Sequence, residues 1–138
     1  MSDASVLHAA ALMYARGADR RDKALWRQVL THDIVITGPG FAIEGLDANL
    51  GSIDHLAQAF VSTRHIVHDI DAVIVGDAAE GETRSTAEHR LANDTLLVWA
   101  IRYQDQWRCE MGVWRFSRRE LVVDWQEVRP LTALGGGA

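Results

Sequence analysis

Over about residues 2–30 and 47–63, apolar residues recur every three or four positions, which is the period of an α-helix. The segment SDASVLHAAALMYARGADRRD predicts a first helix, with Ser2 or Asp3 as its N-cap. A second helix is expected to start at Asp22 and to extend to Leu30, so that Asp19 lies in the corner between the two helices. The segment DANLGSIDHLAQAFVST predicts a third helix with its own apolar side.

The rest of the chain shows alternating and β-branched residues between turn signals, which is typical of strands. IVITGPGFAIEG predicts a short strand pair that turns at residues 38–40. HDIDAVIV, TRSTAEHRL, TLLVWAIRYQDQWRCE and VWRFSRRELVVDWQ then predict an antiparallel meander, with turns at residues 76–77 and 111–112. Three helices followed by a long, twisted antiparallel sheet indicate an α+β fold. A curved sheet over helices leaves a concave pocket that suits a small apolar ligand.

Length and composition narrow the possible functions. A chain of 138 residues suits one domain, and we expect its core over about residues 5–128 and a flexible tail over 129–138. The net charge is -5 and the 14 basic residues are scattered among 19 acidic ones, so nucleic acid is not an expected partner. A single cysteine, Cys109, cannot form an internal disulfide. With no signal peptide and no long apolar run, we expect a cytoplasmic protein with no membrane partner.

The stretch TRHIVHDID places two histidines, His65 and His68, three residues apart. On a strand they point to opposite faces and cannot bind one metal ion together, and the chain has no HExxH or paired-cysteine motif, so no metal site is expected. Strict alternation groups His65 with Val67, Asp69 and Asp71, and it groups His68 with Ile66, Ile70, Ala72 and Ile74. Alternation alone does not decide which histidine faces inward.

The alternation in TRSTAEHRL is clearer, since it predicts that Ser85, Ala87, His89 and Leu91 form the covered face of a strand. His89 therefore points into the core or the pocket, where a backbone carbonyl could satisfy it without any catalytic role. Tryptophans occur on the second helix and on the later strands, and most are expected in the core or in an interface: Trp26, Trp99, Trp107, Trp114 and Trp125.

The order of these elements, with YARGADRRD early and GVWRFSRR late, resembles the SnoaL-like branch of the nuclear-transport-factor-two-like superfamily. That branch also contains scytalone dehydratase and hexachlorocyclohexane dehydrochlorinase. The resemblance covers about residues 5–128 and implies a cone-shaped sheet of the cystatin-like α+β roll type around a central pocket. By position, Asp19, His65 and Arg119 match a catalytic aspartate, histidine and arginine of the dehydrochlorinase. The resemblance thus selects His65 rather than His68.

The resemblance implies a cofactor-independent lyase or isomerase, similar to a dehydratase or dehydrohalogenase, that acts on a small apolar or aromatic ligand. Asp19 would orient His65, His65 would be the general base, and Arg119 would stabilise developing charge. The expected pocket-lining residues are Tyr14, His89, Trp26 and Trp99. The chain has only two tyrosines and a shorter tyrosine-to-aspartate spacing than the dehydrochlorinase, so the substrate does not carry over.

Three alternatives stay open at this point. A SnoaL-like polyketide cyclase would use the same pocket, whereas a dioxygenase β-subunit-like scaffold or a ligand-binding module would need no proton chemistry. Asp19 could also simply cap a helix, and Arg119 could be a surface arginine. Because relatives are commonly dimers or trimers, we expect a homodimer or homotrimer.

Overall fold

The computed structural model describes residues 4–132 and 134. Two helices come first, α1 (Ala4–Asp19) and α2 (Lys23–Val29), followed by the hairpin β1 (Leu30–Gly38) and β2 (Phe41–Glu44). The third helix is α3 (Leu46–Ala59). Four long strands complete the chain: β3 (Ser62–Val75), β4 (Ala78–Arg90), β5 (Thr95–Glu110) and β6 (Val113–Pro130). The predicted α+β class and the order of its elements are confirmed.

Local chemistry explains the helix boundaries. The Asp22 side chain caps α2 by accepting hydrogen bonds from the backbone N–H groups of Ala24 and Leu25. This helix ends at Val29, so Leu30, which was expected to be helical, instead begins β1. Leu30 is followed by the β-branched segment that pairs into the sheet, and this pairing overrides its helical spacing.

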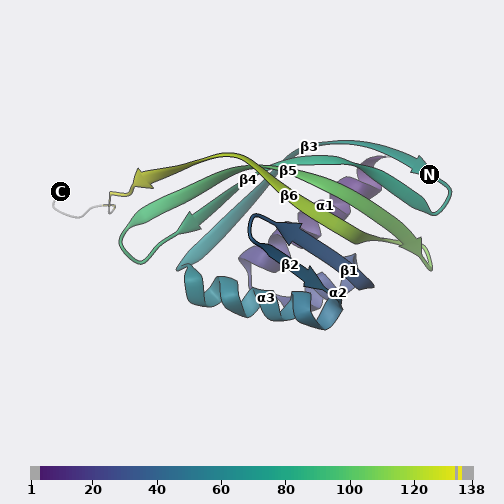
Figure 1. Cartoon of the computed structure of the whole chain (residues 1–138), viewed down its shortest axis with the longest axis horizontal. Coiled ribbons are helices and arrows are strands. Elements are labelled where there is room, and N and C mark those ends of the chain that lie inside the picture. The colour runs from purple at the N-terminus through teal and green to yellow at the C-terminus, as the bar shows by residue number, and fades with distance from the viewer. Residues whose placement is uncertain (1–3, 133, 135–138) are drawn as a thin grey trace.

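The strands form one curved sheet in the order β2-β1-β6-β5-β4-β3, which arches over the helices (Figure 1). Strands β3 to β6 form the predicted antiparallel meander. One pairing departs from the predicted antiparallel sheet, because β1 pairs with β6 in parallel. These two strands are far apart in the sequence, so no turn signal could have revealed their relative direction.

A β-bulge in β3 interrupts the strict alternation that was expected along this strand. The register with β4 shifts between Val67 and Asp69, so His68 is an extra residue in the ladder. Beyond the bulge, the residues packed against the core are Ile70, Ala72 and Ile74 rather than the two aspartates. His65 is therefore on the inward face, whereas His68 is exposed and hydrogen-bonds Thr86 Oγ1 at 2.7 Å.

The main core lies between α1, α2 and the concave face of the sheet, and its fully buried side chains include Leu7, Ile34 and Phe116. Trp26 and Trp107 are buried, as expected of core tryptophans, whereas Trp125 on β6 is 54% exposed. An interface in a homodimer or homotrimer stays a prediction. Among the described helices, none has the length and apolarity needed to cross a membrane.

The flexible tail was predicted to begin at residue 129, which is too early, because β6 extends to Pro130. Arg129 and Pro130 belong to β6 and pair with Leu96 and Thr95 of β5, and the Leu131 backbone N–H donates to the Asp94 carbonyl. Residues 133 and 135–138, which make up most of the rest of the expected tail, lie outside the described residues.

Candidate functional site

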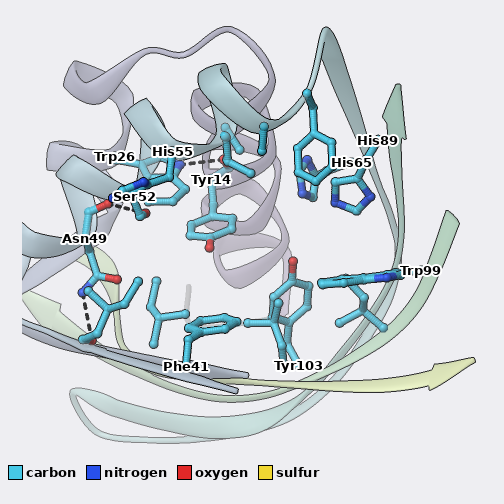
Figure 2. A pocket seen from close by; sticks show the side chains of 18 residues that line it. Tyr14, Trp26, Phe41, Asn49, Ser52, His55, His65, His89, Trp99 and Tyr103 are labelled. Carbon is cyan, nitrogen blue, oxygen red and sulfur yellow. Dashed lines mark hydrogen bonds between the residues drawn. The ribbon is translucent and has the colours of Figure 1, made fainter. Parts of the chain in front are cut away.

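A cavity of about 360 Å³ lies between the helices and the concave face of the sheet. Its 18 lining residues come from α1, α2, β1, β2, α3 and the long strands (Figure 2). All four residues that were expected to line a pocket are among them: Tyr14, Trp26, His89 and Trp99. His65 also lines the cavity. Most of the wall is apolar, and a few polar groups converge on it, which is the usual character of a small-molecule site.

Asp19 and His65 are brought together by the end of α1 and the start of β3. Asp19 Oδ1 is 2.6 Å from His65 Nδ1 and accepts a second hydrogen bond from Thr63 Oγ1 at 3.0 Å. Asp19 Oδ2 accepts from the His65 backbone N–H at 2.9 Å. Both side chains are largely buried, with 22% of Asp19 and 11% of His65 exposed.

This arrangement determines which ring nitrogen of His65 carries the proton. An ionised carboxylate can only accept hydrogen bonds, so Nδ1 of His65 must be the donor toward Asp19. In the neutral ring the other nitrogen, Nε2, is then unprotonated. Since His65 lines the cavity and Asp19 is not among the lining residues, Nε2 is the nitrogen that is left for a ligand.

His89 lies beside His65, with the two ring centroids 6.1 Å apart and nearly perpendicular. Its Nδ1 is 3.0 Å from the carbonyl oxygen of Leu97, which can only accept, so Nδ1 is protonated in this ring too. Burial lowers the pKa of His89, which favours the neutral form with an unprotonated Nε2. The predicted backbone-satisfied histidine and the predicted pocket position are therefore both found at His89.

Two tyrosine hydroxyls supply the donors of the pocket. The hydroxyls of Tyr14 and Tyr103 both point toward its middle (Figure 2). Burial raises the pKa of both groups, so each stays protonated and can donate a hydrogen bond. Tyr103 was not predicted as a lining residue, although the alternation of Trp99, Ile101 and Tyr103 along β5 carried that signal.

Arg119 is placed differently from its expected position. It is 1% exposed and is not among the described residues that line the cavity. Its guanidinium donates to both carboxylate oxygens of Asp105, from Nε at 2.8 Å and from Nη2 at 3.1 Å. The guanidinium carbon also lies 3.7 Å from the Tyr103 ring centroid and 4.5 Å from that of Tyr14. Arg119 thus packs against the rings of the two tyrosines. It is not exposed, as a surface arginine would be, and it does not line the cavity, as a catalytic arginine would.

The opposite end of the cavity was missed by the sequence reasoning. Asn49, Ser52 and His55 of α3 line it there, together with Phe41 of β2 (Figure 2). The available signal was an asparagine, Asn49, on the apolar side of the predicted helix, four residues before Ile53. Among the described residues, no group of three or more histidine, cysteine or acidic side chains is arranged to hold a metal ion.

Comparisons with known proteins identify the family and the fold. A family model described as a SnoaL-like domain matches residues 3–120. A Kribbella flavida protein of known structure is 22% identical, with a TM-score of 0.84 over 91% of this chain and 93% of that one. A type 2 hexachlorocyclohexane dehydrochlorinase is 17% identical, with a TM-score of 0.85 over 95% and 93%. A scytalone dehydratase-like protein from Novosphingobium aromaticivorans is 21% identical, with a TM-score of 0.81 over 95% and 92%. The comparison with curated proteins finds no match.

Proposed function

Because this chain belongs to the SnoaL-like family, as its sequence predicted, we propose that it is a cofactor-independent lyase or isomerase for a small apolar ligand. The single observation that carries the proposal is the 2.6 Å hydrogen bond between His65 Nδ1 and Asp19 Oδ1 at the wall of an apolar cavity. It supplies an oriented imidazole whose free nitrogen can act as a general base. Dehydrochlorinase and dehydratase-like proteins among the structural neighbours agree with this class of chemistry.

In an elimination, His65 Nε2 takes a proton from a carbon atom of the ligand. The electron pair of that C–H bond forms the new double bond, and halide or hydroxide leaves from the neighbouring carbon. The Asp19 carboxylate stabilises the imidazolium that forms on His65. In a dehydration the imidazolium proton passes to the departing hydroxide as water, and in an isomerisation it returns to a different carbon of the ligand.

The tyrosine hydroxyls take the role that was expected of Arg119. Negative charge develops on a leaving group or on an enolate oxygen, and a pre-positioned donor in a dry pocket stabilises it. Tyr14 and Tyr103 can donate to such an atom, whereas Arg119 is paired with Asp105 and packs against the tyrosine rings. Arg119 is therefore proposed as a positioning residue that holds the two phenol rings.

The proposal is tested by comparing His65→Ala with His68→Ala. Proton abstraction is followed as deuterium incorporation at the activated CH₂ of 2-tetralone in D₂O, by proton NMR, beside a screen of cyclic β-halo and β-hydroxy compounds. His65→Ala should lower the enzymatic rate about 10²- to 10⁴-fold, because the base is lost. His68→Ala is the matched control, since His68 is on the same strand but outside the pocket.

Urea unfolding checks that each variant is folded under the assay conditions, so that a lost rate reports chemistry. His65→Ala should unfold at a lower denaturant concentration than the wild-type protein, because it loses the hydrogen bond to Asp19. An unchanged rate in a folded His65→Ala protein contradicts the assignment of the base. Failure of the wild-type protein to accelerate any of these reactions favours a ligand-binding module over an enzyme.

A further inference from the structure

Asn49 is a fully buried polar residue in the first turn of α3, at the end of the cavity away from His65 and His89 (Figure 2). Its Nδ2 group donates to the carbonyl oxygens of Gly45 at 2.8 Å and Ile43 at 3.2 Å. The Ile34 carbonyl is a more distant acceptor at 3.5 Å. The nitrogen side of this amide therefore joins α3 to the β1–β2 hairpin.

The same contacts fix the direction of the amide oxygen. Carbonyl groups can only accept hydrogen bonds, so a flipped side chain would set Oδ1 against three other oxygens and lose every bond that Nδ2 makes. Asn49 Oδ1 is consequently held on the opposite side, and Asn49 lines the cavity. Among the described residues Oδ1 has no hydrogen-bond partner, although it is completely buried. Such an acceptor is unfavourable unless a partner is supplied.

The neighbouring hydroxyl does not supply that partner. Ser52 Oγ donates its proton to the Asn49 backbone carbonyl at 2.6 Å, so its own oxygen also faces outward as an acceptor. The buried Asn49 amide oxygen and the half-buried Ser52 hydroxyl oxygen, which α3 contributes to this end of the pocket, therefore both accept hydrogen bonds. The exposed His55 lies farther out on the same helix.

We propose that Asn49 Oδ1 accepts a hydrogen bond from a hydroxyl or N–H group of the ligand and thereby selects the substrate class. The inference rests on the proposed function, in which the reacting carbon lies at His65. The ligand is then an elongated, mainly apolar ring compound with its reacting carbon at one end and a hydrogen-bond donor at the other. The cavity of about 360 Å³ is larger than the roughly 150 Å³ site that binds benzene, which suits a system of two rings.

Isothermal titration calorimetry with three naphthalenes tests this directly: naphthalene, 2-naphthol and 2,6-dihydroxynaphthalene. Biphenyl, 4-hydroxybiphenyl and 4,4′-dihydroxybiphenyl form a second series with a longer distance between the oxygens. A second hydroxyl strengthens binding only if both ends of the pocket offer an acceptor. In the wild-type protein we expect the diol of the better-fitting series to bind roughly tenfold more tightly than its mono-hydroxy analogue.

In Asn49→Leu the advantage of the diol should fall to a factor near one, while the affinity for the parent hydrocarbon changes by less than about twofold. The parent hydrocarbon is the internal control, because damage to the pocket wall would weaken all members of a series equally. Equal weakening of all three members overturns the proposal, and so does the absence of any diol advantage in the wild-type protein.

A second measurement covers the case in which Asn49→Leu does not fold. A crystal structure of the wild-type protein with the bound diol should show a hydroxyl within hydrogen-bond distance of Asn49 Oδ1, and a water molecule there or both hydroxyls elsewhere overturns the proposal. These measurements need no turnover. A failed diol selection thus refutes the role of Asn49, whereas an unchanged His65→Ala rate refutes the proposed chemistry.

Discussion

Replacing Asp19 by asparagine should reverse the tautomer of His65 while leaving the fold intact. The Asp19 carboxylate accepts from the His65 ring and from Thr63 at Oδ1, and from the His65 backbone N–H at Oδ2. An asparagine has one acceptor oxygen and one NH₂ group. If the NH₂ group faced the backbone N–H of His65, two donors would meet, so the oxygen must stay there and the NH₂ group must face the imidazole. His65 Nδ1 then becomes the acceptor, and its proton moves to Nε2.

The magnitude follows from the number and kind of hydrogen bonds. Bonds to a charged group contribute about 1.5–3 kcal/mol each and neutral ones about 0.5–1.5 kcal/mol, so each of the three loses roughly 1 kcal/mol. Because the Asp19 side chain is 22% exposed, solvent reduces this sum and we expect a loss of about 2 kcal/mol in the free energy of unfolding. In serine proteases the equivalent change lowers kcat by about 10⁴-fold through the wrong tautomer, and we expect a loss of 10²- to 10⁴-fold here.

Two assays follow these effects separately. The ¹⁵N chemical shifts of the His65 ring, recorded by long-range ¹H–¹⁵N NMR, distinguish the two tautomers without any substrate, and urea unfolding gives the stability. Asp22→Asn is the matched control, because Asp22 caps α2 through backbone N–H groups and does not contact His65. The reasoning is refuted if His65 keeps its proton on Nδ1 in a folded Asp19→Asn protein, or if both variants react equally fast.

Two further predictions concern His89, which lines the pocket, and the buried ion pair between Arg119 and Asp105. Burial lowers the pKa of His89, so the unfolded chain binds this proton first as the pH falls, and stability should decrease below the unfolded pKa of about 6.5. His89→Gln should remove that part of the decrease between pH 7.5 and pH 5.5 in urea unfolding, and an identical decrease in both proteins would contradict it. Arg119→Leu should cost about 3–5 kcal/mol in the free energy of unfolding, because it leaves Asp105 buried and unpaired. Replacing both Asp105 and Arg119 by leucine should recover part of the lost free energy of unfolding. No recovery would show that the unpaired Asp105 is not the cause of the destabilisation.

Local periodicity in the sequence was enough to predict the helices, the four long strands and their turns. A period of two or of 3.6 depends only on near neighbours, and burial on one face enforces it along each element. The same alternation placed His89 on an inward face, and the family resemblance singled out Asp19 and His65, whose hydrogen bond is found in the structure.

Tertiary structure alone decided the features that depend on residues distant in the chain. The parallel pairing of β1 with β6 and the bulge at His68 arise from contacts between whole strands. The burial of Arg119 against Asp105 required β5 and β6 to be paired in one register. The fixed amide of Asn49 required three carbonyls from the β1–β2–α3 junction. A linear pattern shows which face a residue occupies, but the direction of a hydrogen bond or an ion pair is determined only when its partners converge in space.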